Sequence, residues 1–68
     1  MLRTDQMWYK IGGIVMELSE RLKISPERAL DLFYTSKTCD ILHSPESQLY
    51  TFSDGYIADE VIAEKQGL

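Results

Sequence analysis

Apolar residues recur at helical spacing in the first third of the chain. They lie mostly three or four positions apart, at Met7, Ile11, Ile14, Val15, Leu18 and Leu22. Because a helix turns such positions onto one face, the spacing predicts an amphipathic helix over about residues 4–22. Gly12 and Gly13 fall inside it and together cost about 2 kcal/mol relative to alanines. The pattern continues in register through both glycines, which favours one helix open to close approach by another; a kink, or a helix starting at Ile14, is the alternative.

A helix start is encoded at residues 25–27. Ser25 is a favoured N-cap, Pro26 suits the first helical position, and the negative charge of Glu27 suits the positive end of the helix dipole. We expect this helix over about residues 26–35, with Ala29, Leu30 and Phe33 on one face. The connection from the first helix is only about three residues long, so the two helices should pack as an antiparallel or steeply crossed pair.

Two more helices are predicted in the second half of the chain. Ser36 can cap a short helix near residues 37–42, and Ser53 can cap a last helix over about residues 54–66. The last helix has an apolar stripe of Ile57, Ala58, Val61 and Ile62 and a polar face of Asp59, Glu60 and Glu64.

The segment between these two helices is less regular. Residues 43–47 predict a turn or a second Ser-Pro-Glu helix start, and residues 49–52 predict a short extended stretch. With three main helices and one short helix, the chain predicts an all-α fold. We expect a small orthogonal bundle that forms a single helical domain over residues 1–68.

The chain has few residues from which to build a cross-linked or metal-bound core. A domain of 68 residues buries only about 60% of its unfolded surface, so its stability margin is small. Cys39 is the only cysteine, which excludes an internal disulfide, and Cys39 with His43 cannot fill a structural zinc site without carboxylates. We therefore expect no cofactor or metal, and homo-oligomer formation or a protein partner as the supplementary source of stability.

Charge and hydropathy limit the surroundings in which the chain acts. The net charge is −4, and residues 44–68 carry one basic and five acidic side chains. Nucleic acid should be repelled there. The sequence contains no signal-peptide core and no apolar run long enough to cross a membrane, and a free cysteine is typical of a reducing cytosol. We expect a cytoplasmic protein without membrane contact.

Cys39 and His43 are the candidate for chemistry. Four positions apart, they share one face of a helix, and with Asp40 nearby they form the minimal outline of a thiol nucleophile and its base. A working site also needs an oxyanion hole and a substrate pocket, for which 68 residues leave little room. The favoured interpretation is a small buried cysteine and a histidine near a helix end, so we expect no catalytic residues and no enzyme activity. The carboxylates of the last helix lack a fixed loop geometry for a metal and are interpreted as solvated surface.

A helix-turn-helix DNA reader is the alternative function that the helical pattern permits. The helix starting at Pro26, or the one after Ser36, would enter the groove. Recognition of DNA bases needs basic or amide side chains. The positive charge of Arg28 is offset by the negative charges of Glu27 and Asp31, and the chain has no asparagine. A DNA-binding transcription regulator therefore stays the alternative function.

Seven aromatic side chains are more than a domain of this size can bury completely. Tyrosines, which combine an apolar ring with a hydroxyl group that can stay in contact with water, are favoured at protein interfaces. We therefore predict a protein-binding surface on the last helix and the neighbouring tyrosines, acidic enough to suit a basic partner. Its residues would be Tyr34, Tyr50, Tyr56, Asp59 and Glu60. The alternative is that Trp8, Phe33 and Phe52 form the core and that the tyrosines cover its edges.

Several of these positions also carry a family resemblance. They are Leu32-Phe33-Tyr34, Ser36-Lys37-Thr38, Leu42, Leu49-Tyr50, Ser53 and Tyr56-Ile57-Ala58-Asp59-Glu60. Across about residues 7–65 the chain resembles a family of short bacterial proteins catalogued as domain of unknown function 3791. The resemblance implies no catalytic residues. It does imply a gene beside ADP-ribosyltransferase-like toxins, and hence an antitoxin or accessory role. The expected function is a non-enzymatic protein-binding or accessory module.

Overall fold

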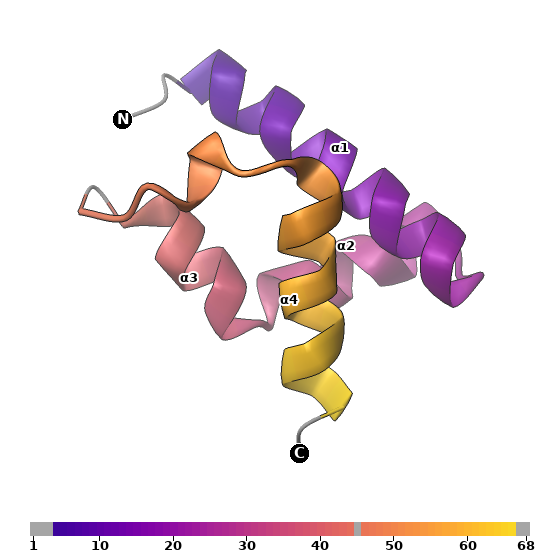
Figure 1. Cartoon of the computed structure of the whole chain (residues 1–68). Helices are drawn as coiled ribbons and strands as arrows, with labels where there is room; N and C mark the ends of the chain where they lie inside the picture. The colour runs from indigo at the N-terminus through magenta and orange to yellow at the C-terminus, as the bar shows by residue number, and fades with distance from the viewer. Residues whose placement is uncertain (1–3, 45, 67–68) are drawn as a thin grey trace.

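Four α-helices and one 3-10 helix make up the computed structural model, which describes residues 4–44 and 46–66. In chain order they are α1 (Thr4–Leu22), α2 (Pro26–Tyr34), α3 (Lys37–His43), η1 (Leu49–Thr51) and α4 (Asp54–Gln66), as drawn in Figure 1. The predicted all-α bundle is confirmed, and each predicted helix ends within one residue of the observed boundary. In the part of the chain that the structure describes, no helix is long and apolar enough to cross a membrane.

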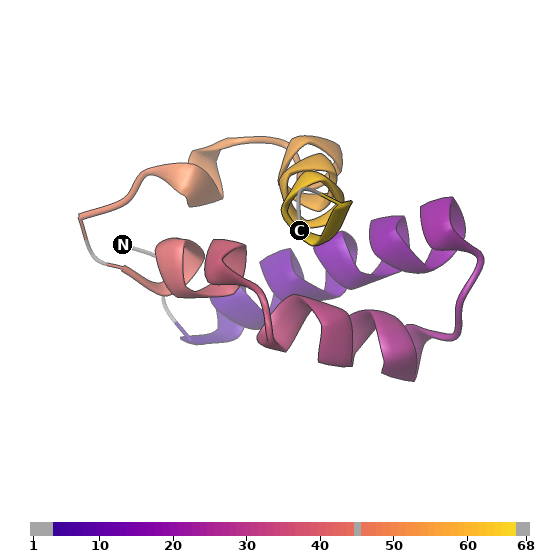
Figure 2. The same cartoon turned by 90° about the horizontal axis from the view of Figure 1, so that it is seen from below.

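The four α-helices pack around a shared centre. Figure 1 shows α4 crossing α1 at a steep angle and α2 returning alongside α1 in the opposite direction. In Figure 2, α2 and α4 lie on opposite sides of the molecule, with α1 and α3 between them. The apolar faces of all four helices therefore meet in the middle.

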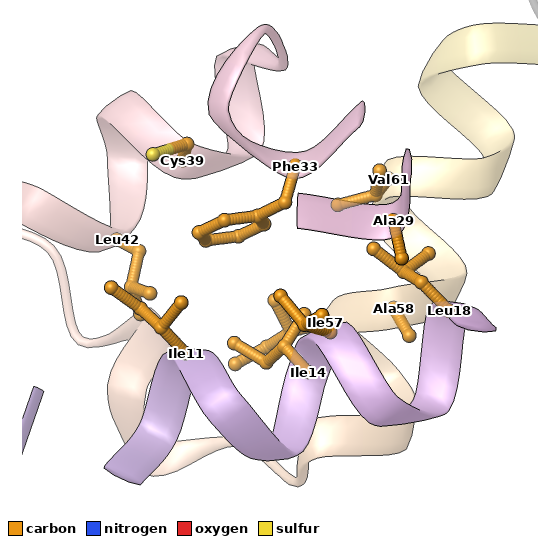
Figure 3. Packing of buried hydrophobic residues seen from close by; sticks show 11 residues of the cluster. Ile11, Ile14, Leu18, Ala29, Phe33, Cys39, Leu42, Ile57, Ala58 and Val61 are labelled. Atoms are coloured by element: carbon orange, nitrogen blue, oxygen red, sulfur yellow. The ribbon is translucent and has the colours of Figure 1, made fainter. Parts of the chain in front are cut away.

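Phe33 lies at the centre of this core. Its side chain is fully buried among side chains from all four α-helices (Figure 3). The buried apolar residues are Ile11, Ile14, Val15 and Leu18 of α1, Ala29 and Phe33 of α2, Cys39 and Leu42 of α3, and Ile57, Ala58 and Val61 of α4. The apolar stripes predicted for α1, α2 and α4 thus form the core, and their end members Met7, Leu22 and Ile62 are partly buried at its edge.

The alternative that Trp8 and Phe52 join Phe33 in the core is wrong. Trp8 is 61% exposed and Phe52 is 44% exposed. One residue turns a helix by about 100°, so Trp8 points away from the face that carries Met7. Phe52 precedes α4, and its ring packs on the ring of Tyr56 with the centroids 4.7 Å apart.

Serine side chains begin three of the helices, as predicted. Ser25, Ser36 and Ser53 each accept a hydrogen bond from the backbone N–H three residues further along the chain, at 3.3, 3.2 and 3.1 Å. Each bond satisfies one of the N–H groups that a helix start leaves without an intrahelical partner. The hydroxyl of the buried Ser36 also donates to the carbonyl of Phe33, which joins the end of α2 to the start of α3.

α1 runs without a break through Gly12 and Gly13, so the single helix is confirmed and the predicted kink or late start is wrong. The surroundings of the two glycines differ. A Cβ at Gly13 would lie 2.8 Å from the Cγ of Asp54, the first residue of α4, and closer still to a carboxylate oxygen. Apart from the local backbone of α1 and the two neighbouring residues, a Cβ at Gly12 would meet no described atom within 4 Å. At Gly13 the close neighbour is therefore the Asp54 side chain of α4, whereas Gly12 keeps the cost of a helical glycine, about 1 kcal/mol, without a contact of this kind.

Ion pairs join α1 to α4 at two points. The Lys10 ammonium lies 2.9 Å from the Asp54 carboxylate and also donates to the carbonyl of Phe52. Arg21 pairs with Asp59 near the other end of α1. Partly exposed pairs contribute only about 0–1 kcal/mol each, so they orient α4 on α1 while the buried apolar residues supply most of the stabilisation.

The connection between α1 and α2 turns at Lys23. The φ of Lys23 is 55°, in the left-handed region. The Ile24 N–H donates to the Ser19 carbonyl at 3.1 Å, and the Ser19 hydroxyl donates to the Ile24 carbonyl at 2.7 Å. This bonding pattern ends a helix and reverses the chain, which is why α2 can return along α1 after so short a connection.

Two predictions for the segment before α4 need correction. The extended stretch predicted over residues 49–52 is wrong, because Leu49–Thr51 is a 3-10 helix. Local hydroxyl groups explain the difference: Ser47 Oγ accepts from the Leu49 N–H at 3.0 Å, and Thr51 donates to the Gln48 carbonyl through its hydroxyl at 2.6 Å. Of the two alternatives for residues 43–47, the turn is confirmed at Glu46, which does not begin a helix, and Pro45 lies outside the described residues.

Candidate functional site

Two neighbouring charged residues of α4 hold the junction between α2 and α3. The Glu64 carboxylate accepts from the backbone N–H groups of Lys37 and Thr38 at 2.7 and 3.1 Å, and from the Thr38 hydroxyl at 3.0 Å. The Lys65 ammonium donates to the Thr35 hydroxyl at 3.0 Å and, at 3.5 Å, to the Thr35 carbonyl. The last turns of α4 therefore bind both helix ends at this junction.

The signs of these two charges match the helix ends that they meet. Glu64 lies at the start of α3, where the helix dipole is positive, and Lys65 lies at the end of α2, where it is negative. The Lys37 N–H, more than any other group, holds the pKa of Glu64 below its usual range; the bonds from Thr38 and the charge of Lys65 add to this, and they outweigh the opposing effect of desolvation. Glu64 is therefore held in its charged form.

Placing Glu64 on the solvated face of α4 was wrong, because its carboxylate binds α3 and the residue is half-buried. Of the other two carboxylates on that face, Asp59 pairs with Arg21 and Glu60 is exposed. Among the residues that the structure describes, no three His, Cys, Asp or Glu side chains are grouped so that they could hold a metal ion.

Cys39 and His43 do share one face of α3. Cys39 Sγ lies 3.6 Å from His43 Nδ1, but this nitrogen is closer, at 2.8 Å, to the Cys39 carbonyl. Cys39 is only 5% exposed, and burial, with a smaller effect from the charge of Asp40, raises the pKa of the thiol. A buried thiol with a raised pKa is a poor nucleophile at neutral pH, so the geometry supports a packing role for Cys39.

The surface depression found on α2 offers little for a reaction at this thiol. It has a volume of about 300 Å³ and is lined by Arg28, Asp31, Leu32 and Thr35. It is open to solvent, and neither Cys39 nor His43 lines it. A site for nucleophilic catalysis needs its pocket next to the nucleophile.

α2 and α3 have the outline of a helix-turn-helix unit, with two residues between them. In such a unit, the first residues of the second helix contact the base edges. Here that end of α3 already binds the Glu64 carboxylate, through Lys37 and Thr38. A negative charge at the reading end of α3 repels DNA, which argues against base recognition by this helix.

The predicted binding residues lie on two sides of the molecule. Tyr34 lies at the end of α2, with its ring centroid 5.7 Å from that of Phe33. Tyr50 lies on η1, and Tyr56 lies on α4 with the two acidic residues. Figure 2 shows η1 and α4 on the side opposite α2. Tyr34 therefore belongs to a helix that lies apart from the elements of the other predicted residues, except where the last turns of α4 reach the end of α2.

Phe52 is the surface residue that the sequence analysis missed. Its ring and that of Tyr56 pack at an interplanar angle of 57°, yet the two residues remain 44% and 45% exposed. Glu60 follows Tyr56 by one helical turn, with exposed Asp59 beside it. The four-residue spacing of Phe52, Tyr56 and Glu60 is the sequence signal for this group. We call Phe52, Tyr56, Asp59 and Glu60 the aromatic–acidic face.

Comparison of the chain with protein-family models, with curated proteins and with solved structures finds no match. The resemblance to domain of unknown function 3791, and the role that it implies, therefore stay predictions.

The bonds of Glu64 predict a pH-dependent stability. Because the pKa of Glu64 is lowered on folding, its contribution is complete above the ordinary value of about 4.5 and is lost as the pH falls through the lower value of the folded chain. Glu64→Gln removes the charge but keeps one acceptor oxygen. We expect its free energy of unfolding in urea to be lower than that of the wild type at pH 7, and the difference to shrink steadily below pH 4.5.

Glu60→Gln, which changes the exposed carboxylate one turn earlier, is the matched control and should change the pH dependence little. Equal pH profiles for Glu64→Gln and Glu60→Gln would contradict the role given to Glu64.

Burial of Cys39 predicts slow alkylation. We expect iodoacetamide at neutral pH to modify the folded chain far more slowly than the chain unfolded in urea, because reaction needs an exposed thiolate. Mass spectrometry of timed samples measures both rates. Similar rates in the two states would show a reactive thiol and reopen the Cys39–His43 pair as a catalytic candidate.

Proposed function

We propose that this chain is a non-enzymatic protein-binding module and that it contacts its partner through the aromatic–acidic face. The observation that supports this proposal is the exposure of Phe52 and Tyr56, whose rings pack on each other at 4.7 Å but stay about half in water. Aromatic side chains are enriched at the centres of protein interfaces, because they bury a large area with few rotatable bonds. An exposed, mutually packed pair is already ordered for such a contact.

The charge beside the aromatic pair favours a basic partner. Glu60 is exposed one turn after Tyr56, Asp59 beside it is exposed but paired with Arg21, and five of the chain's eleven acidic residues lie within residues 44–68, against one basic residue. Opposite charge on a partner would speed its approach, and salt would weaken this effect. Tyr50, half-buried on η1, lies in the segment just before Phe52 and extends the predicted surface.

The resemblance stated above suggests which protein the partner is. A member of that family would bind a neighbouring ADP-ribosyltransferase-like toxin as an antitoxin or accessory protein, in the cytosol. The free Cys39 supports a reducing compartment.

The proposal predicts that a tagged chain captures one stoichiometric protein from its host at low salt. Tyr56→Ala should lose most of that protein, because it removes half of the exposed aromatic pair. Tyr34→Ala is the matched control: Tyr34 is 43% exposed, against 45% for Tyr56, but belongs to α2, which lies opposite α4 in Figure 2. Gel densitometry of the captured protein, at low and high salt, gives the comparison.

Capture of no stoichiometric protein, or equal capture by wild type and Tyr56→Ala, would contradict the proposed function. Loss of capture with Tyr34→Ala alone would move the contact surface to α2.

A further inference from the structure

The outward face of α1 carries large apolar side chains without a partner in the described chain. Trp8 is 61% exposed, Tyr9 is 87% exposed and Met16 is 50% exposed. Trp8, Gly12 and Met16 follow one another at four-residue spacing, and Tyr9 lies one turn before Gly12, so all four share one side of the helix. We call them the α1 outer face.

Gly12 gives this face a recess between bulky neighbours. Apart from the local backbone of α1 and the two neighbouring residues, no described atom lies within 4 Å of a Cβ built there, although the adjacent Gly13 is in close contact with Asp54. The packing of the single chain therefore accounts for Gly13 but not for Gly12. A helical glycine lets a second backbone come close, and at Gly12 this backbone would come from outside the described part of the chain.

We propose that the α1 outer face pairs with the same face of a second copy of this chain, across a two-fold axis at Gly12. The bulky residues stand almost symmetrically about the recess, with Tyr9 three positions before Gly12 and Met16 four positions after it. Antiparallel crossing at Gly12 places Tyr9 of each copy against Met16 of the other. A thioether at the edge of an aromatic ring is a favourable contact, and a self-complementary patch is what a two-fold interface requires.

The distribution of charge permits this pairing. Residues 1–23 carry four basic and three acidic side chains, whereas the excess negative charge lies in residues 44–68. Within α1, the acidic Asp5 and Glu20 lie toward the two ends of the helix. Two helices that cross at an angle diverge away from the crossing point, so these two side chains lie away from the helix of the second copy. Lys10 and Arg21 are already paired with α4 and need no partner from the second copy.

The area available indicates a weak dimer. With 150–250 Å² for a whole aromatic side chain, the exposed parts of Trp8, Tyr9 and Met16 amount to roughly 400 Å² per copy. That is about a tenth of the 4633 Å² surface of the chain. The roughly 800 Å² buried by two copies falls below the size of a stable interface and within that of transient ones. The proposal is separate from the proposed function, which uses the aromatic–acidic face.

Sedimentation velocity and the fluorescence of Trp8, the only tryptophan, test the pairing in the full chain. Between about 5 µM and about 1 mM we expect a change from monomer to dimer, with the emission maximum moving to shorter wavelength as Trp8 leaves water. The double variant Tyr9→Ser/Met16→Ser should raise the Kd at least about 10-fold, since each substitution counts twice across the two-fold axis. Gly12→Gln, which fills the recess with a good helix former, should fold and stay monomeric.

Tyr56→Ser, on the other face, is the matched control and should dimerise as the wild type does; far-UV circular dichroism checks that every variant is folded. A wild-type chain that stays monomeric up to about 1 mM overturns the proposal. A Tyr9→Ser/Met16→Ser variant that dimerises with the same Kd as the wild type overturns the proposal as well. Either result leaves the capture experiment with Tyr56→Ala unaffected, so the two proposals fail separately.

Discussion

Where α4 crosses α1, the backbone of Gly13 lies against the carboxylate of Asp54, the first residue of α4. An alanine on α1 at this point would turn the Asp54 side chain aside and pull its carboxylate from Lys10, its partner at 2.9 Å. Ile57 and Val61, which lie about one and two turns further along α4, are fully buried in the core. In a chain of 68 residues, with a small margin between burial and conformational entropy, the position of α4 on α1 matters because α4 contributes Ile57, Ala58 and Val61 to the shared core.

The same crossing determines where the far end of α4 lies. Ten residues, or about 15 Å of helix, separate Asp54 from Glu64. With its start held on α1, α4 brings Glu64 to the start of α3 and Lys65 to the end of α2. The short helices, of nine and seven residues, could not persist alone; α4 binds their ends while the core buries their apolar faces. The outer surface of α4 is left for Phe52, Tyr56 and the neighbouring acids, and the α1 outer face remains free on its own side.

Local signals account for what the sequence predicted well. Helix starts at Ser25, Ser36 and Ser53 need only residues a few positions away, and the apolar stripes reveal which face turns inward. The Glu64 carboxylate binds residues that lie 26 and 27 positions away in the sequence. No local pattern therefore distinguishes it from a solvated carboxylate. Phe52 is a large apolar residue of the kind expected in a core. Its ring lies at the surface because of the chain geometry at the start of α4. The sequence also left the glycine pair open between a contact and a kink, because nothing local distinguishes Gly13 from Gly12.

Replacing each glycine by alanine tests the close crossing most directly. At concentrations of a few µM, where the chain is monomeric, Gly12→Ala should raise the free energy of unfolding in urea by about 1 kcal/mol, through helix propensity alone. Gly13→Ala should gain less, because the Asp54 side chain must turn aside and weaken its ion pair with Lys10. In an Asp54→Ala background the obstacle is gone, and Gly13→Ala should then stabilise as Gly12→Ala does. Equal stabilisation by both alanines in the wild-type background would contradict the account.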